Sequence, residues 1–105
     1  KKYNKELNSK SIILPLEDKY CYHVYHHYVI RIKKRSKFLN YMKNNGFNLG
    51  IHYKLPVHNQ KILQKYKYNL PITEKVSNEI VSLPMYNGLT EKNQNRLIRL
   101  INNFF

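Results

Sequence analysis

The chain has 105 residues, a mass of 12.8 kDa and 42% hydrophobic residues, which suits one modest core and is too short for several domains. It has neither the roughly 20 consecutive apolar residues of a transmembrane helix nor the apolar core of a signal peptide, so no membrane partner is expected. Its formal charge of +13 suggests a polyanion partner, but only Lys33-Lys34-Arg35 forms a true basic cluster and no nucleic-acid-binding signature is present. A solvated basic surface is therefore favoured, and a small basic nucleic-acid or polyanion-binding module is kept as the alternative.

The single cysteine, Cys21, cannot form an internal disulfide, so a reducing, cytoplasmic location fits best. The sequence begins at Lys1 rather than at methionine, and residues 1–7 resemble the end of a helix. We expect one domain over residues 1–105, as a C-terminal fragment of a longer chain. Residues 1–21 would form the end of a linking helix and a lead-in, and residues 22–105 a small domain.

The first expected strand covers residues 22–32, which are rich in Tyr, Val, Ile and His. Side chains alternate between the faces of a strand, so His23 and His27 would share one face. The other, apolar face would carry His26 together with Tyr22, Val24, Tyr28, Ile30 and Ile32. An imidazole on an apolar face needs a hydrogen-bond partner or a ligand, so His26 is either a satisfied core residue or a site residue.

A helix is predicted next, over residues 36–45, with Ser36 as its N-cap and Gly46 as its C-terminal stop. Its buried face would carry Phe38, Leu39 and Met42. A second strand is expected over residues 47–53.

The remaining elements follow from prolines and apolar spacing. Pro56 permits a short helix near residues 57–66, and Pro71 opens a longer one. Residues 81–84 suit a short edge strand. The last helix would start after Thr90 as N-cap, with Glu91 in its first turn. The apolar face of the Pro71 helix would be Ile72, Val76 and Ile80, and that of the last helix Leu97, Ile98, Ile101 and Phe105.

Strands that alternate with helices of about ten residues predict an α/β domain with α+β-like character: a small sheet of about three strands with helices packed on it. Three covered strands are close to the minimum for independent stability, so docking onto a larger body is expected.

Histidine is the residue type with the clearest chemical potential in this sequence. A metal site is disfavoured, because His23 and His27 would lie ~13 Å apart along a strand and no carboxylate or cysteine stands at ligand spacing. His52, Tyr53 and His58 follow the second expected strand, in a proline-containing loop. Loops at strand ends often carry functional groups, so these three side chains are site candidates alongside His26.

Five segments occur in a distinctive order and spacing between about Tyr22 and Phe105. They are Tyr-His-His-Tyr-Val-Ile-Arg at residues 25–31, the helix ending in Gly46, Gly-Ile-His-Tyr with the following Pro56 and His58, Leu-Pro-Ile-Thr-Glu-Lys-Val at residues 70–76, and Leu-Pro-Met-Tyr at residues 83–86 followed by Leu-Thr-Glu at residues 89–91. Together they resemble the C-terminal part of the DegT/DnrJ/EryC1/StrS family of sugar aminotransferases. Lys54 and Asn87 stand where the family usually has proline.

The resemblance implies the small domain of a fold-type I, pyridoxal-phosphate-dependent enzyme, usually a homodimer. Such enzymes move an amino group, commonly from glutamate, onto a nucleotide-linked keto-sugar. In the family the Schiff-base lysine, the cofactor-phosphate loop and the acidic partner of the pyridine nitrogen lie in the large N-terminal domain, and none of them has a match here. The resemblance therefore implies a chain that binds no cofactor by itself, is inert alone, and needs the missing large domain as a partner.

Carried over position by position, the resemblance assigns substrate positioning to His26, to His52 and Tyr53 of the Ile-His-Tyr segment, and to His58. Arg31 matches an arginine of the family's strand, and substrate, surface and interface roles all remain open for it. A purely structural or dimerisation domain is the third hypothesis, next to the aminotransferase domain and the polyanion-binding module.

Overall fold

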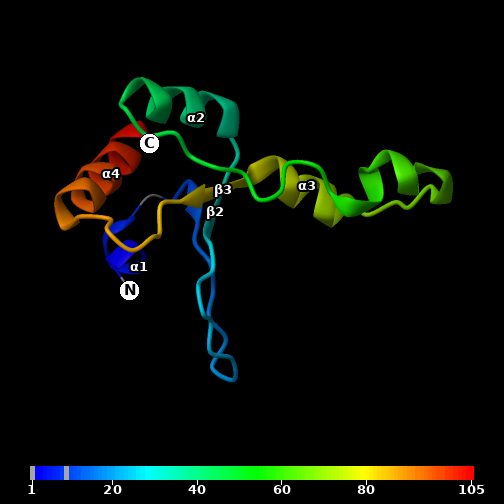
Figure 1. Ribbon diagram of the computed structural model, residues 1–105, viewed down its shortest axis with the longest axis horizontal. Helices are drawn as coiled ribbons and strands as arrows, with labels where there is room; N and C mark the ends of the chain where they lie inside the picture. Colours follow the sequence, from blue (N-terminus) through cyan, green and yellow to red (C-terminus); the bar gives the residue numbers. More distant parts are fainter. Residues whose placement is uncertain (1, 9) are drawn as a thin grey trace.

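The computed structural model describes residues 2–8 and 10–105 as a small body from which two segments project. The body holds a sheet and three helices, and its principal-axis extents are 48 × 37 × 28 Å with the projections included. One projection is an arm formed by residues 14–27, and the other contains residues 57–79 and ends in a helical tip (Figure 1).

The sheet has three strands, β1 (Ile12–Ile13), β2 (Tyr28–Ile32) and β3 (Ile80–Leu83), in the order β1-β2-β3 with both pairings antiparallel. β2 and β3 pair from Tyr28↔Leu83 to Arg31↔Ile80. Aromatic and β-branched residues make up four of the five residues of β2 and two of the four of β3, and these residue types favour extended backbone. The predicted sheet of about three strands with helices packed on it is confirmed.

Two of the predicted strand assignments are wrong. Only residues 28–32 of the expected strand 22–32 pair, because residues 22–27 belong to the arm and find no partner strand there. Tyr22 is 89% exposed and His26 is also exposed, so neither lies on an apolar sheet face. Residues 47–53 contribute a single bridge, Gly50↔Ser82, and the third strand is instead Ile12–Ile13.

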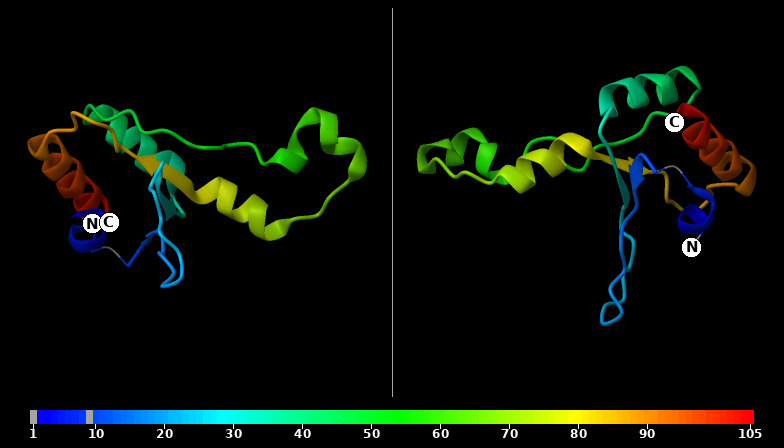
Figure 2. Two further views of the ribbon diagram at one scale, coloured as in Figure 1. Left: turned by 60° about the horizontal axis from the view of Figure 1, so that its bottom comes forward. Right: turned by 180° about the vertical axis from the view of Figure 1, so that it is seen from behind.

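The core lies between the sheet and two helices, α2 (Arg35–Asn44) and α4 (Glu91–Phe104), which lie next to each other in both views of Figure 2. A third helix, α1 (Lys2–Glu6), closes the body, since the amide of Asn102 on α4 donates to the carbonyl of Glu6 at 2.8 Å. The largest fully buried side chains come from β2, β3, α2 and α4 and are Phe38, Ile30, Ile32, Met42, Leu97, Ile101 and Val81. The sheet thus buries one face and leaves the other available.

The sequence predicts the C-terminal end of α2 correctly but not its N-terminal cap. Gly46 has φ +84° just beyond the helix, a conformation that only glycine adopts easily, so the predicted stop is confirmed. The predicted N-cap is wrong. Lys34 takes the N-cap position and makes no side-chain capping hydrogen bond, while Ser36 is already inside the first turn and exposed.

The later helices start where their signals predict. In α3 (Pro71–Glu79), Pro71 occupies the first turn, where its missing N–H costs no hydrogen bond. In α4 the hydroxyl of Thr90 accepts a hydrogen bond from the Asn93 amide at 3.2 Å. No helix in the described residues is long and apolar enough to cross a lipid bilayer.

The predicted burial is wrong at two places in these helices. Ile72 is 78% exposed although Val76 and Ile80 are half-buried, because the outer end of α3 extends beyond the sheet. Phe105 follows the last helical residue and is 43% exposed. The segment predicted as a short helix near residues 57–66 forms two 3₁₀ turns, η1 (Val57–Asn59) and η2 (Lys61–Tyr66).

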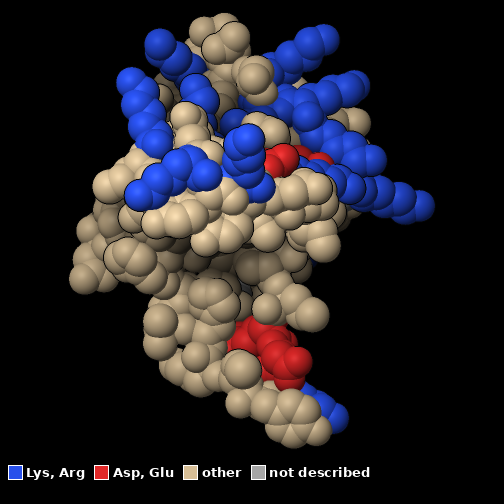
Figure 3. Space-filling model, turned by 90° about the vertical axis from the view of Figure 1, so that its right-hand side faces the viewer, with Lys and Arg blue, Asp and Glu red and all other residues tan. Residues whose placement is uncertain are grey.

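The surface at the α3 end of the molecule is basic, with lysine and arginine side chains over most of its upper part and small acidic areas (Figure 3). Residues 54–79 carry five lysines against Glu74 and Glu79. Like charges spread over a projecting segment repel one another and keep it hydrated.

We expect Ile30→Ala to lower the free energy of unfolding by about 2–5 kcal/mol, because Ile30 is fully buried on the central strand and its truncation leaves a cavity. Chemical denaturation of the chain measures this loss. Ile62→Ala is the matched control, because Ile62 is 76% exposed and its truncation should change the free energy of unfolding by about 0.5 kcal/mol or less. Similar losses for the two variants would contradict the described core.

Candidate functional site

The face of the sheet that points away from α2 and α4 carries the candidate site. Along β2 the residues Tyr28, Ile30 and Ile32 are buried in the core, so Val29 and Arg31 point to the opposite face. On β3 the register pairs Ser82 with Val29, which places Ser82 on this same outer face. Ser82 is the only polar residue of β3, and it is buried.

The segment around Gly50 crosses the outer face at Ser82. The Ser82 amide donates to the Gly50 carbonyl at 2.9 Å, which holds this segment against β3. The His52 ring folds back over Gly50 so closely that a Cβ atom at Gly50 would lie 2.7 Å from Cε1 of His52. A larger residue at position 50 would therefore displace the His52 ring. The His52–Tyr53 peptide bond is cis.

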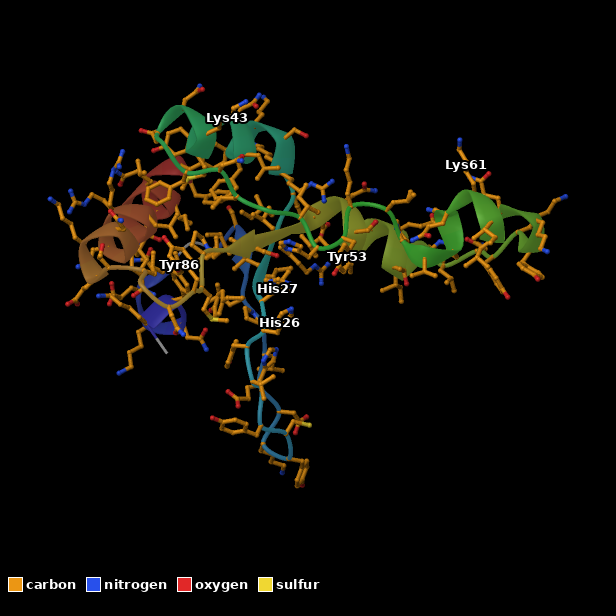
Figure 4. All side chains as sticks on the ribbon, viewed as in Figure 1. His26, His27, Lys43, Tyr53, Lys61 and Tyr86 are labelled. Carbon is orange, nitrogen blue, oxygen red and sulfur yellow. The ribbon has the colours of Figure 1, made fainter. Side chains whose placement is uncertain are left out.

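Two imidazoles stack at this crossing. The rings of His27 and His52 lie 4.2 Å apart and are parallel to within 4°. Nδ1 of His52 makes a hydrogen bond of 2.9 Å with the Ser82 hydroxyl. His26 adds a third ring, tilted, at 4.2 Å from His27. Figure 4 shows His26 and His27 where the arm joins the sheet.

The rings of His27 and His52 border a hollow of about 250 Å³, which we call the histidine hollow. Its lining comes from the arm junction, from the Gly50 segment and from the chain after β3, and consists of His27, Asn48, Leu49, Gly50, His52, Ser82, Leu83, Pro84 and Tyr86. The Pro84 carbonyl accepts a hydrogen bond of 2.7 Å from the Tyr3 hydroxyl, so α1 fixes that wall of the hollow. The lining offers imidazole, hydroxyl, amide and phenol groups, which recognise hydroxyl-bearing ligands.

Burial lowers the pKa of His27, and the neighbouring His26 and His52 lower it further, because their positive charge would repel a proton on His27. The stack therefore favours a neutral His27 ring near neutral pH. A neutral imidazole has one donor and one acceptor nitrogen and can bond a hydroxyl group in either sense.

The five residues predicted to bind substrate are spread over the outer face rather than gathered. Only His52 lines the histidine hollow. His26 and Tyr53 contact its rings, since the Tyr53 ring stands edge-on to His52 at 5.7 Å and is itself 75% exposed. His58 is buried, and its Nε2 lies 3.1 Å from a carboxylate oxygen of Glu74.

Arg31 lies farther along β2 and pairs with Glu79, with Nη2 at 2.8 Å and Nε at 3.1 Å from the same carboxylate oxygen.

The sequence analysis did not identify Ser82 and Tyr86 as site residues, and it did not predict that the His27 ring stacks on His52. His27 shares the alternation of Val29 and Arg31, and that signal could have placed it on the outer face. Nothing local distinguishes Ser82 from an ordinary strand residue.

No three His, Cys, Asp or Glu side chains within residues 2–8 and 10–105 come together in a way that could hold a metal ion. The fit of pyridoxal phosphate can be tested on the histidine hollow. No lysine and no carboxylate line it, so it offers neither an amine for the cofactor aldehyde nor an acid for the pyridine nitrogen. The hollow does not fit this cofactor, and we derive no reaction step through it.

Comparisons with known proteins agree with the resemblance. The model of the DegT/DnrJ/EryC1/StrS aminotransferase family matches residues 1–102. A "Pleiotropic regulatory protein" of Geobacillus stearothermophilus is 34% identical over 97 residues, covering 90% of this chain and 26% of that protein. A "dTDP-3-amino-3,6-dideoxy-alpha-D-galactopyranose transaminase" of Aneurinibacillus thermoaerophilus is 29% identical over 103 residues, covering 97% of this chain and 28% of that protein.

Solved structures match the fold over the same span. A DegT DnrJ EryC1 StrS aminotransferase from Brucella abortus matches with a TM-score of 0.87 and 26% identity, covering 98% of this chain and 28% of that one. DesV from S. venezuelae, in complex with a ketimine intermediate, matches with a TM-score of 0.92 over 98% of this chain and 29% of that one, and at 22% identity it shows the fold alone.

The chain thus spans about a quarter of the length of the relatives that it matches. Within that span the family model covers nearly every residue, and the three-stranded sheet with its helices is the fold of the matching region in solved members. The chain belongs to the DegT/DnrJ/EryC1/StrS aminotransferase family.

Proposed function

We propose that this chain is the small C-terminal domain of a pyridoxal-phosphate-dependent aminotransferase that acts on a nucleotide-linked keto-sugar, with glutamate as the amino donor. The observation that carries the proposal is the His27–His52 stack held by Ser82 in a chain of this family. Relatives named as dTDP-sugar transaminases and a UDP-sugar aminotransferase support the substrate class.

Positioning is the role that we assign to the histidine hollow. A transaminase must hold the keto carbon at about 3–3.5 Å from the attacking amine, and contacts to remote parts of the substrate supply that alignment. Ser82 engages Nδ1 of His52 and leaves Nε2 as the ring's other polar atom. His52 would bond a sugar hydroxyl through Nε2, with Tyr86 of the same lining and the exposed rings of Tyr53 and His26 as further contacts.

We assign His58 and Arg31 a structural role rather than direct contact with the substrate. Both are already paired with glutamates, His58 with Glu74 and Arg31 with Glu79. Their pairing supports a role in holding α3 against η1 and β2, so they would influence substrate through the elements that they connect.

The cofactor would come from outside this chain. Pyridoxal phosphate acts as the electron sink of amino transfer when it is bound. The missing large domain would supply the Schiff-base lysine, the phosphate loop and the acidic partner, and the whole protein would act as a homodimer. By itself the present chain would bind no cofactor and transfer no amino group.

Ser82→Ala should lower the free energy of unfolding by about 1 kcal/mol, because it leaves Nδ1 of His52 without its buried hydroxyl partner. Urea denaturation measures the loss, and the ring resonances of His52 in NMR spectra should shift as well. Ser36→Ala is the control, since Ser36 is exposed and makes no capping bond. Unchanged His52 resonances in Ser82→Ala would contradict the described contact.

Stability should fall as the pH decreases from about 7.5 to 5.5. The pKa of His27 is lowered in the folded chain, so below the ordinary value of about 6.5 the unfolded chain takes up this proton first and is stabilised. Denaturation midpoints across this pH range measure the slope. His27→Gln removes the titrating ring and should flatten the curve, whereas an unchanged slope in that variant would assign the effect to other groups.

The decisive experiment expresses the complete coding sequence that contains this chain and measures glutamate-dependent amination of dTDP- and UDP-linked keto-sugars. We expect activity that requires pyridoxal phosphate, and none from the 105-residue chain alone. His52→Gln should lower kcat/KM by about tenfold to a hundredfold, the equivalent of one or two good hydrogen bonds. His23→Gln, on the exposed arm, is the matched control. An upstream region without a Schiff-base lysine would overturn the proposal.

A further inference from the structure

A second pocket lies between β1, the turn from β2 to α2, and the end of α3. Its volume is about 370 Å³, and it shares no lining residue with the histidine hollow. Its polar lining comes from three separate segments and consists of Lys10, Ser11, Arg31, Lys33, Lys34 and Glu79. We call it the basic pocket.

The charges in the basic pocket do not balance. Arg31 forms an ion pair with Glu79, with Nη2 at 2.8 Å from the carboxylate oxygen. Among the described residues no carboxylate forms an ion pair with Lys10, Lys33 or Lys34. Four cationic side chains therefore face the carboxylate of Glu79 in this lining, which leaves an excess of three positive charges among its side chains.

The positive charge continues into the start of α2. Arg35 and Lys37 follow Lys34 in the chain, and the first turn contains no acidic residue. Lys33 and Lys34 also border a shallower hollow with Arg35, Ser36, Lys37 and Asn78. The N-terminal end of a helix is the positive end of its dipole, so cations gathered there repel the dipole and one another. An anion placed between them would relieve both repulsions.

We propose that the basic pocket binds a multivalent oxyanion, a phosphate or diphosphate group. Arg31 is pre-organised for this role, because it lies on the central strand and Glu79 holds Nε and Nη2 in place. Lys33 and Lys34 approach from the turn, and Lys10 approaches from the segment before β1. A fixed guanidinium surrounded by mobile ammonium groups combines the two cationic side chains that bind phosphate best. The diphosphate is either free in solution or part of a nucleotide.

The test titrates the 105-residue chain with orthophosphate, pyrophosphate and a nucleoside diphosphate at about 0.15 M ionic strength, and follows binding by calorimetry and by backbone NMR shifts. We expect saturable binding of pyrophosphate with shifts confined to residues 31–37 and their neighbours. Lys33→Gln/Lys34→Gln should weaken it by about tenfold, because two charge-assisted contacts are lost. If the nucleoside diphosphate binds more tightly than pyrophosphate, the natural ligand is a nucleotide. If the two bind equally, the pocket recognises only the diphosphate group, and the ligand is a free diphosphate.

The matched control is Lys61→Gln/Lys65→Gln, which removes the same charge from η2 at the far tip of the molecule (Figure 4). This variant should change the affinity by about twofold or less, since only long-range attraction is altered. If both double variants weaken pyrophosphate binding equally, or if the backbone NMR shifts spread over the whole basic surface, the proposal of a phosphate site in the basic pocket is wrong. Single-stranded DNA that binds more tightly than pyrophosphate and is lost equally in both variants would also overturn it, in favour of a diffuse polyanion surface. No step of this test measures amino transfer, so its failure is separable from that of the proposed function.

Discussion

The antiparallel register of β2 and β3 is the constraint on which the rest of this structure depends. It pairs Tyr28 with Leu83 and Ile30 with Val81 on the core side, and it sets Ser82 opposite Val29 on the outer side. Because side chains alternate along a strand, a slip of one residue would exchange the two faces. The apolar core under α2 and α4 fixes this register, and the same register places the one buried hydroxyl of β3 where the Gly50 segment and His52 can bond it.

The parts of the fold that the sequence predicts are those with local causes. Pro71 and Thr90 start their helices, and Gly46 ends α2, because fixed φ, side-chain capping and positive φ act within a few residues. The strand boundaries were not predictable in this way. Residues 22–27 have strand composition but no partner, while the two-residue strand Ile12–Ile13 is strand only because β2 lies beside it. Pairing between distant segments decides both cases.

The candidate site shows the same difference between features with local causes and features set by distant contacts. His52 was identified from its position after an apolar segment, and the structure does place it in a hollow. Its supports, Ser82 and the stacked His27, come from segments about 25 to 30 residues away in the chain and required the sheet register to be known. His58 was singled out by the same loop argument, yet its ring is buried against Glu74. Residue type and loop position therefore identify polar rings, and only tertiary contacts show which ones face a ligand.

The junction between α3 and β3 has a mechanical consequence. α3 ends at Glu79 and β3 begins at Ile80, so no loop separates the helix from the strand. The Arg35 guanidinium braces this junction by donating to the carbonyls of Ser77 and Ile80. A projecting helix joined to a strand without a flexible link acts as a lever arm. The direction of α3 is therefore tied to that of β3, and Ser82, the hydrogen-bond partner of His52, lies only two residues beyond the first residue of the strand.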